Sequence, residues 1–169
     1  KVFFHKAYGY HTYDKQTPVD LTDVYDLASL TKLCATTAAI MYLFDKNIIS
    51  LQATIESYLP QFKGTPIGGV KLKEILVHQS GLPAWIPFHK TFVQSDSIRQ
   101  IFLSQTHSPE FPLQIADNLF IKESYKDTIF KIFSECTIGK KKYLYSDIGY
   151  YIFPLIIEKL TNTPFEEFV

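Results

Sequence analysis

The sequence predicts an α+β fold in which one short pair of strands comes first and several helices follow. Residues 2–13 (VFFHKAYGYHTY) are rich in aromatic and β-forming residues around Gly9, a pattern typical of two short strands or a hairpin. From about residue 29 onward, apolar residues recur at helical spacing in several separate segments. Since one strand pair does not form a stable sheet alone, further strands must come from sequence outside these 169 residues or from another chain.

Both ends of the chain have the composition of incomplete secondary-structure elements. Residues 1–4 (KVFF) already have strand composition, and the given residues begin with neither an initiating Met nor the pattern of a signal peptide. Residues 164–169 (PFEEFV) have the pattern of a helix that has just begun. We therefore expect residues 1–169 to form a single domain that is incomplete at both ends and belongs to a longer protein.

The longest predicted helix runs from about Ser29 to Lys46. Its apolar residues lie nearly all round the helix, so we expect it to be buried. Asn47 is a typical residue at which a helix ends. A short helical turn within residues 48–62 and a Gly- and Pro-rich loop at residues 63–70 follow.

Four more helices are expected along the rest of the chain. They fall at residues 71–78, 97–104, 122–136 and 148–160, separated by an aromatic-containing loop at 84–95, a Pro-bearing connection through 118 and a basic turn at 139–142. The last helix has Ser146 and Asp147 as alternative caps, and Pro154 inside it should produce a kink.

The composition excludes several classes of function. With 17 basic and 17 acidic residues, the net charge of zero gives no electrostatic basis for binding nucleic acid or an anionic membrane. No apolar run reaches the ~18 residues of a membrane span. Cys34 and Cys136 lack zinc or CxxC spacing, so two buried thiols are the simplest interpretation, with a disulfide left open. His5, His11 and His107 are scattered, so we expect no metal site.

Residues 26–32 (DLASLTK) place a serine and a lysine three apart where the longest predicted helix begins. Residues at this spacing share a helix face, so Lys32 can reach the hydroxyl of Ser29. Backbone N–H groups of a first helical turn point outward and favour the oxyanion of an attacked carbonyl. Burial and the positive helix terminus would lower the pKa of Lys32 and let it take the serine proton. The arrangement suits acyl transfer through a covalent acyl-enzyme.

The Ser-x-x-Lys spacing is not specific by itself. A chain of this composition contains such a pair about once by chance. The alternative interpretation is a helix cap at Ser29 and a solvated side chain at Lys32.

Together with three later segments, DLASLTK resembles the nucleophile region of the serine β-lactamase and penicillin-binding-protein superfamily. The likeness is greatest to its branch of class C-like β-lactamases, D-Ala-D-Ala carboxypeptidases and esterases. Residues 75–83 (ILVHQSGLP) are similar to the family's Leu-x-His-x-Ser-Gly-Leu turn, residues 145–147 (YSD) stand where the family has Tyr-x-Asn, and residues 149–165 match the helix that follows. The resemblance covers nearly the whole chain. It implies a truncated β-lactamase/transpeptidase-like fold, in which an N-terminal strand pair accompanies the mainly helical subdomain and most of the sheet is missing.

The resemblance implies a role for each of four side chains. Ser29 is the nucleophile, Lys32 the base or its helper, and Tyr145 the tyrosine whose phenol lies against the nucleophile and shuttles its proton. Tyr145 is alternatively a packed core tyrosine in a chain with 11 Tyr. Asp147 replaces the family's Asn. An ionised Asp only accepts hydrogen bonds and would hold Lys32 protonated, which shifts the base role toward Tyr145 or weakens turnover. Alternatively, Asp147 caps the last helix, and both roles are compatible.

Other polar and aromatic side chains near these motifs have structural interpretations. His78 is of the type most often used as a general base, but the resemblance places it in a structural turn in which Gly81 takes the unusual backbone angles. Trp85, Phe88 and His89 follow this turn and either line the rim of a cleft or simply pack.

A third family motif is absent from these residues. The family carries Lys-Thr-Gly or His-x-Gly on a later strand that also supplies the second oxyanion N–H. Only 22 residues follow Asp147, and none of them forms such a motif. Losing one oxyanion donor typically costs about 10²–10³ in rate. We therefore expect the 169-residue chain to be inactive by itself.

The sequence thus predicts that the parent protein is a serine hydrolase acting on an amide or ester carbonyl of a β-lactam, a cell-wall peptide or a small ester. No organic cofactor or metal is expected. The alternative is a non-catalytic module that binds cell-wall fragments. More narrowly, residues 115–120 (IADNLF) and 142–147 (KYLYSD) resemble domains of Bacteroidetes-like bacteria, which in some relatives follow a family 3 β-N-acetylglucosaminidase. By family, the location is the periplasm or the cell exterior.

Overall fold

The structure is a computed structural model that describes residues 1–90, 92 and 95–169. The chain divides into two compact units, residues 1–31 and residues 32–169.

The first unit, whose residues are all described, contains no regular strand. Its β-type pairing is an isolated bridge between Tyr10 and Pro18. Phe3 is 91% exposed, so no neighbouring strand covers this segment. The predicted strand pair within residues 2–13 is therefore wrong here. A strand needs partners for its backbone N–H and C=O groups, and among the described residues none pairs with this segment over more than one bridge.

The second unit holds the regular elements. In chain order they are the π-helix η1 (Lys32–Thr37), the α-helices α1 (Ala38–Asp45) and α2 (Ile55–Tyr58), the 3₁₀-helix η2 (Pro60–Phe62), α3 (Leu72–Leu76), α5 (Asp96–Phe102), β1 (Leu103–Ser104), β2 (Leu113–Ala116), β3 (Leu119–Ile121), α6 (Tyr125–Ser134), α7 (Ile148–Thr161) and α8 (Phe165–Phe168). The four helices expected after residue 70 are confirmed, with shifts of a few residues at their ends. Helix α7 continues through Pro154.

A small antiparallel sheet with the strand order β1-β3-β2 gives the fold its β component. It lies at residues 103–121, which the sequence predicts as the end of a helix and a loop. Asp117 and Asn118 join β2 to β3, and Asn118 takes a φ of 52°, which Asn tolerates better than most residues. The α+β class is confirmed, but its strands are not those predicted. The Asp117-Asn118 turn lacks the glycine that marks most two-residue hairpin turns, so the sequence does not indicate it.

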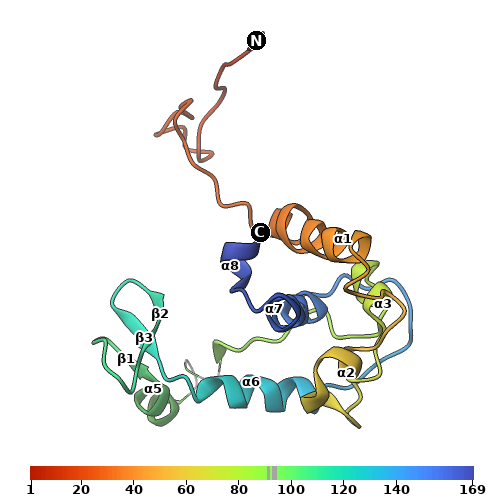
Figure 1. The fold of residues 1–169 in the computed structure, drawn as a ribbon. Helices are drawn as coiled ribbons and strands as arrows, with labels where there is room; N and C mark the ends of the chain where they lie inside the picture. Colours follow the sequence, from red (N-terminus) through yellow and green to blue (C-terminus); the bar gives the residue numbers. More distant parts are fainter. Residues whose placement is uncertain (91, 93–94) are drawn as a thin grey trace. The chain divides into compact units, whose positions relative to one another are not determined.

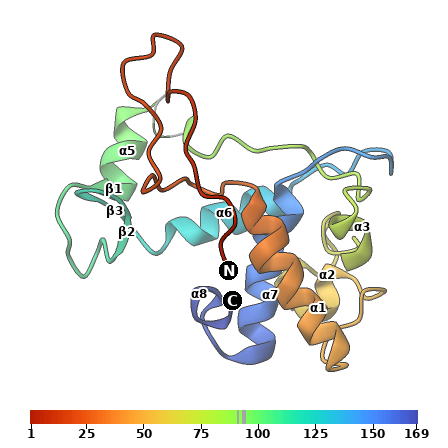
Figure 2. The same cartoon turned by 90° about the horizontal axis from the view of Figure 1, so that it is seen from above.

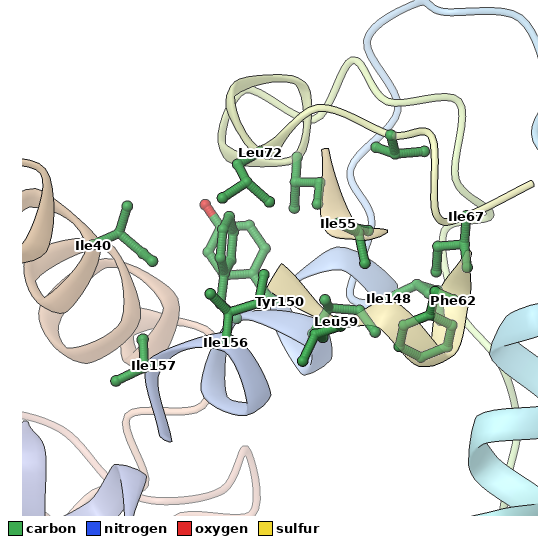
Figure 3. Packing of buried hydrophobic residues seen from close by; sticks show 14 of the residues in the cluster. Ile40, Ile55, Leu59, Phe62, Ile67, Leu72, Ile148, Tyr150, Ile156 and Ile157 are labelled. Carbon is green, nitrogen blue, oxygen red and sulfur yellow. The ribbon is translucent and has the colours of Figure 1, made fainter. Parts of the chain in front are cut away.

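Helix α7 is the central element of the second unit. It contacts α1, α2, α3 and α8, and it lies between α1 and α6 in Figure 1; Figure 2 shows the same helices from above. Its buried residues are Ile148, Gly149, Tyr150, Ile152, Phe153, Ile156 and Ile157. They pack against side chains of α1, α2, η2 and α3 (Figure 3). This core fixes α3 and α7, the two helices next to residues 75–83 and 145–147.

Helix α1 is buried on one face only. Ile40 and Leu43 are 1% exposed, whereas Met41 is 65% exposed, and Leu33 in the preceding η1 is 64% exposed. The prediction of an all-round buried helix is therefore wrong for this structure, in which α7 and its neighbours cover a single face of α1. The predicted stop is confirmed, since Asn47 has a φ of 58° and the Ile48 N–H returns to the Leu43 carbonyl (2.9 Å).

Gly149 allows α3 and α7 to approach closely. A Cβ atom at this position would lie 2.1 Å from Cγ2 of Ile75, which is itself buried. We expect Gly149→Ala to lower the free energy of unfolding by about 1–3 kcal/mol, even though alanine has the higher helix propensity, because the core has no space for the added methyl group. Urea denaturation of the full-length protein measures this change.

Gly69→Ala is the matched control, because nothing lies within 4 Å of a Cβ atom at residue 69. It should change stability by less than about 0.5 kcal/mol. Equal effects of the two substitutions would contradict the proposed contact between Gly149 and Ile75.

Candidate active site

Two segments far apart in the sequence, residues 78–84 and 139–147, are joined by hydrogen bonds. Three backbone bonds run from the N–H groups of Gly139, Leu144 and Asp147 to the carbonyl groups of Gly81 (2.8 Å), His78 (2.9 Å) and Ala84 (2.9 Å), respectively. The Ser146 hydroxyl also donates to the Pro83 carbonyl (2.6 Å). These paired segments hold the backbone of the Tyr-Ser-Asp motif on the turn that follows α3.

The turn depends on left-handed backbone conformations. Gly81 has a φ of 78°, which confirms its predicted role, and a Cβ atom there would lie 2.5 Å from the Gly139 carbonyl oxygen. His78 also has a positive φ, of 55°, which the sequence did not indicate. Gly81 is thus required both for the turn and for the close approach of the second segment.

The paired segments present Tyr145 and Asp147 to Lys32, the first residue of η1. The Lys32 ammonium lies 2.6 Å from Oδ1 of Asp147. It also lies 5.3 Å from the ring centroid of Tyr145 and 5.8 Å from that of Tyr150. The two charged side chains are 18% and 25% exposed, so the ion pair is largely buried. Three of the four predicted site residues therefore meet in one cluster.

The ion pair decides the protonation of Lys32. Burial lowers the pKa of Lys32, but hydrogen bonds to Asp147 and Tyr145 and the charge of Asp147 outweigh it, so this pKa is raised above 10.5. The predicted lowering of the Lys32 pKa is therefore wrong, and the expectation that Asp147 holds Lys32 protonated is confirmed. At neutral pH, Lys32 is a hydrogen-bond donor and a positive charge.

The cap of α7 is made by Ser146. Its hydroxyl oxygen accepts from the Ile148 N–H (3.2 Å), while Asp147 forms no side-chain cap bond. Of the two alternative caps, Ser146 is thus the one used, and the carboxylate of Asp147 is directed to Lys32 instead.

His78 supports the site through its imidazole ring. Its Nδ1 accepts a hydrogen bond from the Ser146 N–H (3.1 Å), and its ring lies 4.4 Å from the Tyr145 ring and 5.3 Å from the Tyr150 ring. Burial and the charge of Lys32 hold the pKa of His78 below 6.5, against the smaller effect of Asp147. A neutral ring with its proton on Nε2 fits this bond. The structure thus gives His78 the positioning role implied by the resemblance.

Ser29 belongs to the first unit, in a turn held by local hydrogen bonds. The Ala28 N–H donates to Oδ1 of Asp26 (2.7 Å). The N–H groups of Leu30 and Thr31 donate to the carbonyl groups of residues 27 and 28, respectively. Ala28 has a φ of 45°, which is uncommon for a residue with a Cβ atom. Ser29 therefore follows a strained residue and is exposed.

The other side chains singled out from the sequence have simpler positions. Cys34 is exposed and Cys136 buried, and the two thiols are not bonded to each other, so burial is confirmed only for Cys136. Phe88 packs on Phe133 and Tyr151, and Trp85 lies half-exposed. Among the described residues, no group of His, Cys, Asp or Glu could hold a metal ion. In the same part of the chain, no helix has the length and apolarity needed to cross a membrane.

The β-lactamase family model matches residues 1–169 of this sequence. The chain belongs to the β-lactamase family. Its relatives include a proposed D-alanyl-D-alanine carboxypeptidase of Salmonella gallinarum, which is 29% identical over 99% of this chain. The chain spans 37% of the length of that relative.

Solved structures of the β-lactamase family share the fold. A class C β-lactamase from Rhodobacter sphaeroides is 19% identical with a TM-score of 0.57, and the match covers 95% of this chain and 37% of that protein. A β-lactamase/D-alanine carboxypeptidase from Pseudomonas syringae gives 16% identity and a TM-score of 0.59 over 95% of this chain and 36% of that one. The truncated β-lactamase-like fold predicted from the sequence is thereby confirmed.

The sequence did not single out the two tyrosines of α7 that complete the surroundings of Lys32. Tyr150 places its ring near the ammonium, and the pKa of Tyr151 is raised by burial and by the charge of Asp147, against the opposing charge of Lys32. Residue 151 lies four positions after Asp147, so it shares a helix face with it. That spacing is the signal by which Tyr151 could have been found.

We expect acidification to destabilise the protein through His78. The folded state holds the pKa of His78 below 6.5, so the unfolded chain binds more protons as pH drops through this value. The free energy of unfolding must then fall with falling pH. A protonated Nδ1 also loses its bond from Ser146. Urea unfolding of the full-length protein at a series of pH values measures the effect.

His78→Asn is the matched variant, because Asn tolerates a positive φ, accepts hydrogen bonds through Oδ1 and does not titrate. Its loss of stability between pH 6.5 and 4.5 should be smaller than that of the natural protein. Glu74, whose pKa lies below 4.5 because the Lys141 hydrogen bond outweighs burial, titrates below this window. An equal loss in both proteins would rule out His78 as the cause.

Proposed function

We propose that the full-length protein is a serine hydrolase that attacks an amide or ester carbonyl with Ser29. The observation that supports this most directly is the buried cluster of Lys32, Tyr145 and Asp147, which occupies the positions of the family's motifs. Ser29 precedes Lys32 by three residues, so chain connectivity alone keeps their Cα atoms within about 11 Å of each other.

The protonation of the cluster suggests how the proton moves. In acylation, Oγ of Ser29 bonds to the carbonyl carbon, and its proton passes to the Tyr145 oxygen as the Tyr145 proton passes to the leaving group. Protonated Lys32 stabilises the negative charge that develops on the Tyr145 oxygen. In deacylation, water supplies a hydroxyl to the acyl carbon and a proton to Ser29. Tyr145 is therefore the proposed proton shuttle, with Lys32 as its electrostatic partner.

The substrate class is proposed from the relatives. The Salmonella relative is named for D-alanyl-D-alanine carboxypeptidase activity, which supports a cell-wall peptide as substrate, with β-lactams and small esters as related carbonyl compounds. A location in the periplasm or at the cell exterior, and fusion to a glycoside hydrolase, belong to the same proposal. The chemistry of Ser29, Lys32 and Tyr145 requires no metal or organic cofactor.

A second candidate function is a non-catalytic module that binds cell-wall fragments. The observation that favours it is the 2.6 Å ion pair between Lys32 and Asp147, which keeps the ammonium protonated and so removes one general base. A carboxylate also has no N–H to donate to a substrate carbonyl. Such a protein would retain the fold and bind its ligand without forming an acyl-enzyme.

Covalent labelling distinguishes the two functions. The full-length protein is incubated with a fluorophosphonate and, separately, with a penicillin, and intact masses are compared with those of Ser29→Ala. For a serine hydrolase we expect a mass gain in the natural protein that is lost in the variant. The 169-residue chain should show no such gain, because it carries no third motif. A folded full-length protein that gains no mass with either reagent would favour the binding module.

Asp147→Asn tests the role of the ion pair. Removing the carboxylate charge lowers the pKa of Lys32, and each unit of lowering raises the neutral fraction of this lysine about tenfold at neutral pH. Because Tyr145 is the proposed proton shuttle and Lys32 acts through its charge, we expect fluorophosphonate to label Ser29 of the full-length variant no faster than Ser29 of the natural protein. The measurement is the labelling rate at neutral pH, with Ser29→Ala in the same background as the blank. A rate about tenfold faster would show that neutral Lys32 takes the serine proton instead.

A further inference from the structure

An apolar groove lies between α6 and α7, next to the candidate active site. Its volume is about 470 Å³, which falls within the range of small-molecule sites. The lining residues are Phe88, Lys126, Ile129, Phe130, Phe133, Tyr151 and Leu155. Neither the family motifs nor the proton transfer described above makes use of this groove.

The walls of the groove are held by aromatic packing. The Phe88 ring meets the buried Phe133 ring edge-on at 5.9 Å and the Tyr151 ring at 6.2 Å. Phe130 packs on Phe62 of the core at 5.8 Å. These contacts restrict the side chains that face the groove, so it is a preformed site.

The lining favours an uncharged ligand. Lys126 is the charged member of the lining set, and its ammonium is already paired with Glu123 (3.3 Å). An anionic ligand would have to compete with that carboxylate, whereas an aryl or alkyl group would be covered by the remaining aromatic and aliphatic side chains.

Two short stretches of chain connect the groove to the Lys32–Asp147 cluster. Tyr151 lies one helical turn after Asp147, and its N–H donates to the Asp147 carbonyl (3.2 Å). Phe88 lies four residues after Ala84, whose carbonyl accepts from the Asp147 N–H (2.9 Å). Tyr151 lines the groove and lies one helical turn after Asp147, so α7 links the groove to the cluster.

We infer that the groove is the subsite for an uncharged aryl or medium-length alkyl substituent of the substrate. This inference rests on the proposed hydrolase function and narrows its substrate class to carbonyl compounds that carry an apolar group. A second protein copy is the less favoured occupant, because the volume suits a small molecule rather than an extended interface.

The test compares fluorophosphonates of one reactive group and different substituents on the full-length protein. Rates of mass gain at Ser29 are measured with the methyl, octyl and phenylbutyl reagents. We expect the octyl and phenylbutyl reagents to label at least about tenfold faster than the methyl reagent, because burial of each methylene group adds to binding. The ratio of octyl to methyl rates reports the groove and is independent of the amount of active protein.

Substitutions on α6 test whether the faster labelling by the octyl reagent arises from binding in the groove. Ile129→Trp fills the groove and Ile129→Ser makes its lining polar, and each should lower the octyl-to-methyl ratio about tenfold. Ile129→Ser is included because the larger side chain of Ile129→Trp could disturb folding. Lys131→Trp is the matched control, since Lys131 is exposed on the opposite face of α6 and should leave the ratio unchanged.

Each outcome of these labelling experiments supports or overturns the subsite assignment. Equal labelling by all reagents, or a ratio unaffected by both Ile129 variants, would overturn the subsite while leaving the hydrolase function in place. A change of oligomeric mass in Ile129→Trp without a change in the ratio would instead identify the groove as an interface between copies. If no reagent labels Ser29, the hydrolase function fails, and the subsite assignment fails with it.

Discussion

The candidate site depends on the hydrogen bonds between residues 78–84 and 139–147. They connect the end of α3 to the start of α7, and they fix the backbone from which Tyr145 and Asp147 extend. Gly81 makes this pairing possible because its backbone turns left-handed and its missing Cβ leaves space for the Gly139 carbonyl. His78 completes it through a ring nitrogen. Residues that take no part in bond making therefore determine where the chemically active side chains lie.

Asp147, which stands where the resemblance places an Asn, has two opposing electrostatic effects on Lys32. The carboxylate satisfies the buried ammonium of Lys32, which stabilises the cluster, but it also removes the neutral amine that could take a proton. Tyr145 and Lys32 can still act together if the tyrosine carries the proton and the lysine carries the charge. The same side chain thus stabilises the buried charge of Lys32 and disfavours the neutral form of this lysine.

Helical periodicity predicted most helices because it depends on neighbouring residues, whereas the grouping of Lys32, Tyr145 and Asp147 was implied by the resemblance to the family's motifs. The strand pair at residues 2–13 failed because strands need distant partners, and composition does not report whether these are present. The hairpin at Asp117-Asn118 was not predicted because its turn lacks the glycine that marks most two-residue hairpin turns. The distance between Lys32 and the Asp147 carboxylate and the groove at Ile129 depend on tertiary packing, which the sequence does not report.

The contact of Gly149 with Ile75 has a mechanical consequence. It locks α3 to α7 with no intervening side chain, and these two helices carry the two halves of the paired segments. Tyr145, Asp147 and the His78 turn must then move as one rigid body. Separating them would require breaking the contact between Gly149 and Ile75.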